Sequence, residues 1–225
     1  MSRSYAVGTF LAFPLVSKPS LSGVYLLLDE QWVPRHHLPS VLERAAGCGI
    51  RLFQYRNKTG SPRDVFAKAK ELREVAARSD VLFIVNDRCD IAKAVEADGV
   101  HLGQDDLPLA LARNIMGRDK IIGISTHRPE EVTQATRGGA DYVGYGPLFP
   151  TTTKKAHEVP VGCAGLRDIR PLTSLPVFAI GGITLDSVEE VVASGANGVA
   201  VASAVFDASS IEQAMRDFVR SFRNL

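Results

Sequence analysis

Polar side chains follow several short apolar segments of this sequence, and their types suit the binding of a phosphorylated ligand. The segment FQYRNK places Gln54, Arg56 and Lys58 at alternate positions. Alternate residues of a β-strand point to the same side, so these three would face one site. An exposed polar strand edge is the plainer interpretation. However, three polar groups in a strand buried on both faces need partners, and an anionic ligand would supply them.

Two acidic segments are candidates for a divalent cation site. Asn86 and Asp87 directly follow the apolar run VLFIV, and Asp105 and Asp106 follow GVHLG. Magnesium usually binds through one or two carboxylates and completes its octahedron with water and substrate phosphate. Asp87, and one of Asp105 and Asp106, could instead only cap the helices that follow. His101 lies within the predicted strand before Asp105, where a packed or hydrogen-bonded core histidine is expected.

Hydroxyl groups, lysines and glycines follow four further apolar runs. Ser125 in ISTH could reach a site, whereas Thr126 and His127 could simply begin the next helix. The segment GPLFPTTTKK, residues 146–155, is either a solvated loop or a lid that grips an anion. The segments AIGGIT and VASAV end in glycines and small residues, where backbone N–H groups could hold a phosphate. These features together imply two phosphorylated ligands, or one ligand with phosphates at both ends.

Composition limits the classes of function. The chain has 225 residues and a net charge of +1, so no overall field would draw it to nucleic acid or to anionic lipid. Three widely spaced cysteines indicate a reducing compartment, with the cytoplasm as the default. No apolar stretch approaches the ~20 residues that span a bilayer. The sequence also lacks the HExxH, P-loop and Rossmann glycine motifs.

The elements that must position these residues alternate along the chain. Near-continuous apolar runs are typical of parallel strands covered by helices. Strands are predicted over residues 24–29, 51–55, 81–86, 99–103, 121–125, 142–146, 177–182 and 198–203. Helices are predicted over residues 62–79, 128–139, 184–195 and 211–222, with a short helix over 165–170. Thr126 is a possible cap for the second of these helices, and Thr184 with Ser187 for the third.

An internal repeat favours a (β/α)8 barrel over an open doubly wound sheet. Segments EADGVHLGQ, GGADYVGYGP and SGANGVAVAS share a helix end, a tight turn and a strand start, which indicates repeated βα units. Eight strands that alternate with helices predict a single-domain (β/α)8 TIM barrel, with an open doubly wound sheet as the alternative. Residues 1–22 are predicted to be an N-terminal extension, and residues 23–225 the barrel. In such a barrel the polar residues above would meet at the carboxyl ends of the strands.

The motifs resemble those of the thiamine-phosphate synthase family, also called thiamine-phosphate pyrophosphorylase. The series QYRNK, NDR, GVHLGQDD, GISTH, DYVGYGPLFPTTTKK, PVFAIGGI and GVAVASAV appears in order from about Gly23 to Phe206. The resemblance implies a (β/α)8 barrel that couples hydroxymethylpyrimidine diphosphate to a thiazole phosphate, with magnesium and release of pyrophosphate. Two departures are Asn57, where the family usually has an acidic residue, and KAHEVPVG, which leaves His157 without an inherited role.

The same resemblance assigns roles to individual residues. Arg56, Lys58 and Lys154 are implied to be catalytic cations. The pyrimidine diphosphate is assigned to Gln54, Arg56, Lys58, Asn86, Ser125 and Lys154. The thiazole phosphate is assigned to Thr151, Thr152, Thr153, Gly182, Ala202 and Ser203. Asp87 and Asp106 are the implied Mg²⁺ ligands, whereas Lys155 is expected to be solvated.

The charges predict a dissociative reaction. Departure of diphosphate builds negative charge, which magnesium and the three cations would stabilise while the aminopyrimidine carries a carbocation. Two rivals remain: a thiazole tautomerase on the same barrel, and a non-catalytic sensor of a phosphorylated metabolite. The expected partners are small phosphorylated substrates, with no nucleic acid and no membrane, and a homo-oligomer is possible.

Overall fold

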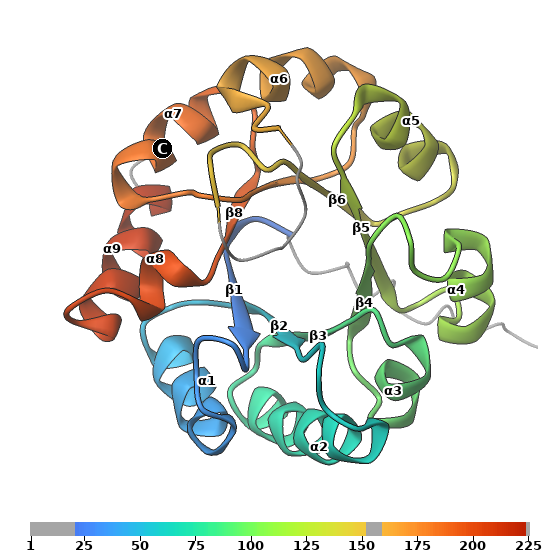
Figure 1. Ribbon diagram of the computed structural model, residues 1–225, viewed down its shortest axis with the longest axis vertical. Helices are drawn as coiled ribbons and strands as arrows, with labels where there is room; N and C mark the ends of the chain where they lie inside the picture. The colour runs from blue at the N-terminus through green and yellow to red at the C-terminus, as the bar shows by residue number, and fades with distance from the viewer. Residues whose placement is uncertain (1–20, 152–158, 224–225) are drawn as a thin grey trace, which may run out of the picture.

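Eight parallel strands form a closed barrel in the computed structural model, which describes residues 21–151 and 159–223. Neighbours in the barrel are also neighbours in the chain, and β8 pairs with β1 to close it (Figure 1). The strands are Gly23–Asp29 (β1), Leu52–Arg56 (β2), Leu82–Asn86 (β3), Gly99–Leu102 (β4), Ile121–Thr126 (β5), Tyr142–Tyr145 (β6), Val177–Ile180 (β7) and Gly198–Val201 (β8).

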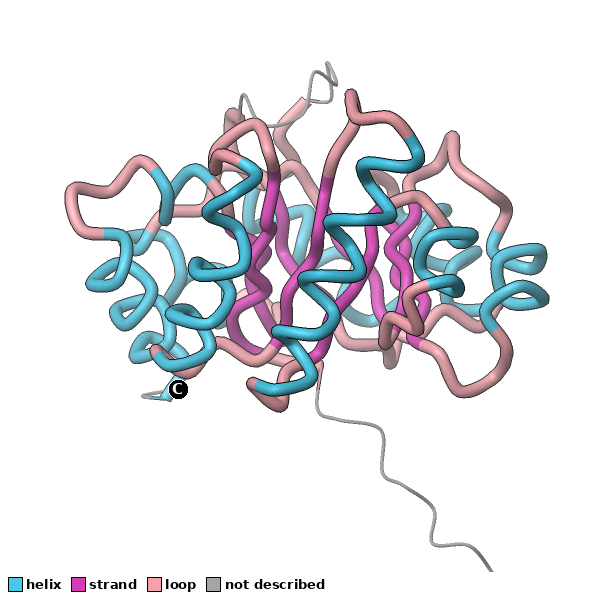
Figure 2. The backbone as a smooth tube through the Cα atoms, turned by 90° about the horizontal axis from the view of Figure 1, so that it is seen from below, coloured by secondary structure: helices cyan, strands magenta, loops and turns pink. Residues whose placement is uncertain are grey.

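Helices surround the barrel, so the strands are enclosed on their outer side (Figure 2). They are Leu38–Gly47 (α1), Pro62–Arg78 (α2), Cys89–Ala94 (α3), Leu109–Met116 (α4), Pro129–Arg137 (α5), Gly162–Ile169 (α6), Leu185–Ala193 (α7), Ser203–Phe206 (α8) and Ile211–Arg223 (α9). In α2, Ser61 accepts a hydrogen bond from the Asp64 N–H and begins the helix. Its buried side chains, including Val65, Ala69 and Leu72, recur at helical spacing and face the strands. Burial of Leu72 alone contributes about 1.5–3 kcal/mol.

The (β/α)8 prediction is confirmed, and the open sheet is excluded by the β8–β1 pairing. The chain forms one domain over the residues described. The first strand, β1, begins at Gly23, and residues 1–20 of the predicted extension lie outside the described residues. The helix predicted over 165–170 starts earlier, at Gly162.

The predicted helix caps have different outcomes. Thr126 does not cap α5, because it is the buried last residue of β5 and donates a hydrogen bond to the carbonyl oxygen of Gly144. The N-cap of α5 is Arg128. At the start of α7, the backbone N–H of Thr184 donates to Ser187 Oγ, as the predicted cap requires.

The apolar core is divided by the strands into two clusters. The larger lies between the strands and the helices, and the smaller fills the barrel interior around Tyr25, Tyr142 and Phe178. Glycines make room for these rings. A Cβ added at Gly123 would lie 2.0 Å from Cζ of Tyr142, and one at Gly198 would lie 2.5 Å from Cε1 of Phe178. The glycines of β5 and β8 therefore allow aromatic rings to occupy the barrel interior.

In the two described segments, no helix combines the length and the apolar character needed to cross a bilayer.

Candidate functional site

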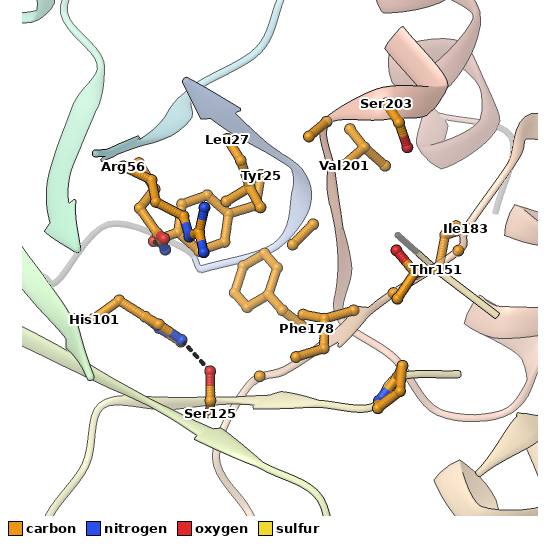
Figure 3. A pocket seen from close by; sticks show the side chains of 18 of the residues that line it. Tyr25, Leu27, Arg56, His101, Ser125, Thr151, Phe178, Ile183, Val201 and Ser203 are labelled. Carbon is orange, nitrogen blue, oxygen red and sulfur yellow. Dashed lines mark hydrogen bonds between the residues drawn. The ribbon is translucent and has the colours of Figure 1, made fainter. Parts of the chain in front are cut away.

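A pocket opens into the barrel interior and is lined mainly by residues at and beyond the carboxyl ends of the strands (Figure 3). Seven of the predicted site residues line it: Gln54, Arg56, Ser125, Thr151, Gly182, Ala202 and Ser203. Arg56 and Tyr25 lie on one side of the pocket, whereas Thr151 and Ser203 lie on the other. Groups from β2, β5, the loops after β6 and β7, and the start of α8 thus meet in one cavity.

Arg56 is held at this pocket by a residue that sequence reasoning missed. Its Nη1 donates to Asp29 Oδ2 at 2.5 Å, and the two residues stand opposite each other at the ends of β1 and β2. Both side chains are largely buried, with 11% and 3% of their surfaces exposed. The Arg56 Nε is also buried, and it has no hydrogen-bond partner among residues 21–151 and 159–223. An unsatisfied guanidinium donor beside a pocket suits an anionic ligand.

A second cluster of charged side chains lies where β2, β3 and β4 end. Lys58 forms an ion pair with Asp87, and Asp106 lies close enough to act on the Asp87 carboxyl. Burial raises the pKa of the Asp87 carboxyl, and Asp106 raises it further, while Lys58 opposes the shift. Two adjacent carboxylates, one of them partly desolvated, need a cation to be ionised together. Carboxylate oxygens are the ligands that magnesium prefers in proteins, so these two residues could hold such an ion.

The alternative in which these aspartates only cap helices is wrong. The N-caps of α3 and α4 are Arg88 and Pro108, and neither helix has a side-chain cap. Asp106 instead accepts a hydrogen bond from the Gly103 N–H at 2.7 Å, which turns it back towards the end of β4. Asp105 is exposed. The structure therefore favours Asp106 over Asp105 as the partner of Asp87.

Asp87 also has an unusual backbone conformation. Its φ is +63°, in the left-handed region that few residues other than glycine occupy, although aspartate tolerates it better than most. Its N–H donates to the carbonyl oxygen of His101 at 2.8 Å. Asn86, the residue before it, ends β3 and pairs in register with His101. Asn86 does not line the pocket, so the structure places it beside the site rather than in the cavity.

A chain of buried hydrogen bonds crosses the floor of the pocket. Gln54 Nε2 donates to Tyr25 Oη at 2.7 Å, and Tyr25 Oη lies 2.8 Å from Tyr142 Oη. Tyr142 Oη lies 2.9 Å from His101 Nδ1, and His101 Nε2 lies 2.8 Å from Ser125 Oγ. All five residues are buried, and we call this set the polar relay. It contains the core histidine that the sequence predicts, but Tyr25 and Tyr142 were missed.

The opposite side of the pocket is built from backbone and small side chains. Gly181 and Gly182 have φ values of +86° and +66°, and the loop after β6 packs directly on them. A Cβ at Gly182 would lie 2.5 Å from the carbonyl oxygen of Pro150. Ala202 and Ser203 follow β8 at the start of α8 and line the same cavity. This arrangement agrees with a phosphate site formed by backbone N–H groups.

His127 is a further lining residue that the sequence interpretation left aside. It follows β5, and its Nδ1 contacts the carbonyl oxygen of Gly146. A carbonyl only accepts, so Nδ1 carries a proton and Nε2 points away from that bond. The prediction that His127 simply begins a helix is wrong, because α5 starts at Pro129 with Arg128 as its N-cap. Thr152, Thr153, Lys154, Lys155 and His157, which the sequence places after β6, lie outside the described residues.

The fold and the pocket together define a (β/α)8 barrel whose site suits phosphorylated small molecules. Residues 24–205 match the sequence model of a family described as thiamine monophosphate synthase. The chain belongs to this family.

Two related proteins and one solved structure are similar to this chain over most of their length. The chain is 44% identical to the thiamine-phosphate synthase of Halalkalibacterium halodurans, over 84% of this chain and 90% of that protein. It is 49% identical to the thiamine-phosphate synthase of Chloroflexus aurantiacus, over 79% and 82% of the two chains. A solved structure of thiamine phosphate pyrophosphorylase from Pyrococcus furiosus superposes with a TM-score of 0.82 at 36% identity, and covers 90% of this chain and 96% of that one.

Proposed function

We propose that this protein is a thiamine-phosphate synthase, a transferase of thiamine biosynthesis. It couples 4-amino-2-methyl-5-hydroxymethylpyrimidine diphosphate with 4-methyl-5-(2-phosphoethyl)thiazole to give thiamine phosphate and pyrophosphate. A carboxylated thiazole phosphate could also serve as the second substrate. Family membership supports this function. The structural observation that carries it is a pocket with Arg56 on one side and Thr151 and Ser203 on the other, which Gly182 and Ala202 also line.

Each substrate is assigned to one side of the pocket. The diphosphate binds beside Arg56 and Lys58, where cationic groups and an unsatisfied guanidinium donor are available. The phosphate of the thiazole binds the backbone around Gly182 and Ser203, with Thr151 beside it. Thr152, Thr153 and Lys154 complete the two sites from the segment that follows, on the resemblance alone.

The reaction breaks the bond between the exocyclic carbon of the pyrimidine and the diphosphate oxygen. The bonding electron pair leaves with the diphosphate, and the electron-rich aminopyrimidine carries the positive charge. The thiazole nitrogen then donates its lone pair to form the C–N bond. Arg56, Lys58 and Lys154 stabilise the leaving charge, and the pocket holds the two rings close together. No proton needs to be removed in the coupling step.

Asp87 and Asp106 would hold the magnesium ion. When bound, the ion neutralises developing charge on the diphosphate. The two aspartates fix its position, and Gly103 orients Asp106 through its backbone N–H. Lys58 contacts Asp87 and so links the cation site to the diphosphate side of the pocket.

We also place this reaction in the cytoplasm. Cys48, Cys89 and Cys163 are free, which supports a reducing compartment.

A two-substrate assay tests the function. The purified protein is mixed with magnesium and the pyrimidine diphosphate, the thiazole phosphate, or both, and released pyrophosphate is measured. A synthase releases pyrophosphate rapidly only when both substrates are present. Ligand binding without turnover would indicate the sensor instead, and isomerisation of a thiazole without coupling would indicate the tautomerase.

A further inference from the structure

The polar relay crosses the barrel interior from Gln54 on β2 to Ser125 on β5. Its members come from β2, β1, β6, β4 and β5, in the order Gln54, Tyr25, Tyr142, His101 and Ser125. Tyr25, His101 and Ser125 can be followed in Figure 3, where a dashed line joins the last two. Four hydrogen bonds connect the five residues, and every member lines the pocket.

The rings of the relay are held rigidly. Tyr25 and Tyr142 each pack edge-on against Phe178, with centroid distances of 5.3 and 5.4 Å. The ring of His101 stacks on Tyr142 at 5.5 Å. Burial raises the pKa of both phenols above their usual range, so each keeps its single proton. Fixed, neutral hydroxyls can transmit a hydrogen-bond direction without moving.

The amide of Gln54 sets that direction. Its Nε2 can only donate, so Tyr25 accepts from it. The proton of Tyr25 then goes to Tyr142, and that of Tyr142 goes to His101 Nδ1. With the opposite direction between the two tyrosines, the buried Tyr25 hydroxyl proton would have no acceptor among the described residues, which is unfavourable for a buried donor. Nδ1 is therefore the unprotonated nitrogen of His101, and Nε2 donates to Ser125.

Each hydroxyl in the relay has only one proton to donate. The Gln54 amide therefore cannot rotate by half a turn without changing the direction of the other bonds. If Oε1 faced Tyr25, all four bonds would have to reverse together, including the tautomer of His101. The relay thus couples the orientation of the Gln54 amide to the direction of all four bonds. In the structure Nε2 lies on Tyr25, and Oε1, which only accepts, is left for a ligand. An amide without such anchoring could offer either its donor or its acceptor to a ligand.

We propose that Tyr25, Tyr142 and His101 are positioning residues that fix the Gln54 amide and so make the site selective for an aminopyrimidine over the corresponding oxopyrimidine. This inference rests on the proposed function. An exocyclic amino group donates a hydrogen bond, which Gln54 Oε1 accepts, whereas an oxo group in the same place presents a second acceptor. The oxopyrimidine would bind well only after the whole relay reversed.

The test measures binding rather than turnover. Affinities for the aminopyrimidine diphosphate and for its 4-oxo counterpart are determined by calorimetry with magnesium, and their ratio defines the selectivity. We expect Tyr142→Phe and Tyr25→Phe each to lower this ratio at least about tenfold, the scale of one unsatisfied buried partner. The double variant should lower it no further, because either change releases the same amide.

Tyr55→Phe is the matched control. Tyr55 is as buried as Tyr25, but its hydroxyl donates to Glu30 Oε1 at 2.6 Å, and it does not line the pocket. The selectivity ratio of Tyr55→Phe should stay at the wild-type value. Thermal unfolding of all variants reports any loss of fold. Unchanged selectivity in both relay variants, or additive losses in the double variant, would overturn the positioning role alone. A wild-type protein that binds neither diphosphate would overturn the proposed function as well.

Discussion

Arg56 and Asp29 form a buried ion pair at the point where β1 and β2 end side by side. Asp29 Oδ2 accepts from Arg56 Nη1, while no residue that the structure describes bonds to the buried Nε of the same guanidinium. The aspartate therefore fixes a cation at the wall of the pocket without satisfying all of its donors. A pair arranged in this way links the stability of the barrel to the binding of an anion.

Removal of either partner should therefore have a large and distinct effect. Arg56→Ala should lower kcat/KM for the pyrimidine diphosphate by about 10²–10³, the scale of one lost preorganised charge contact. Asp29→Ala should lower the free energy of unfolding by about 3–5 kcal/mol, because it leaves a buried charge uncompensated. Steady-state kinetics and urea unfolding measure the two effects.

The control for this pair is Arg44→Ala. Arg44 forms an ion pair with Glu212, but both side chains are substantially exposed, at 55% and 38%. Its loss should change stability by at most about 1 kcal/mol and leave kinetics unchanged. If Asp29→Ala were as mild as Arg44→Ala, the buried pair would not stabilise the barrel end.

The metal assignment predicts a difference between adjacent aspartates. Asp106→Asn and Asp87→Asn should each raise the magnesium concentration needed for half-maximal rate at least about tenfold, because each removes one of two carboxylate ligands. Asp105→Asn changes the same chemical group one residue away, on an exposed side chain, and should leave the magnesium requirement unchanged. An equal effect at Asp105 would show that the pair with Asp87 is wrongly assigned.

Much of the fold follows from the sequence because each strand is marked locally. The apolar runs are short and bounded by glycine or polar residues, and all eight strands appear within about two residues of their predicted limits. The polar groups after these runs were also recognisable. Gln54 and Ser125 reach the same pocket, as the resemblance implies, because barrel strands bring their carboxyl ends to one rim.

Other parts of the site have no local signal. Tyr25 and Tyr142 lie inside apolar strands and resemble ordinary core residues, yet their hydroxyls meet across 117 residues of sequence. Asp29 ends an apolar run and gives no indication that Arg56 stands opposite it. The choice between Asp105 and Asp106 likewise depends on the Gly103 N–H, which only the folded loop directs at one of them. Such contacts arise from barrel closure and register, which sequence patterns do not specify.

The lysines after β6 provide a test outside the described residues. Lys154→Ala should lower the rate of pyrophosphate release by about 10²–10³ with the fold intact, because it removes a cation that stabilises the leaving diphosphate. Lys155→Ala removes the same charge at the next position, where a solvated lysine is expected, and should behave as wild type. Single-turnover rates and circular dichroism compare the two. A fully active Lys154→Ala protein would contradict this role.

On the thiazole side of the pocket, we expect the backbone of Ser203 to contribute more to phosphate binding than its hydroxyl group. Ser203 lines the pocket at the first residue of α8, and its proposed contact with the phosphate is through the main chain. Ser203→Ala should therefore leave KM for the thiazole phosphate within about threefold, less than the cost of one neutral hydrogen bond. Ser203→Asp places a negative charge against the phosphate and should raise that KM at least about thirtyfold, because like charges in a binding site cost several kcal/mol. The KM for the pyrimidine diphosphate, measured in the same variants, should change much less, since Arg56 lies on the other side of the pocket. If Ser203→Ala were as damaging as Ser203→Asp, the hydroxyl rather than the backbone would bind the phosphate.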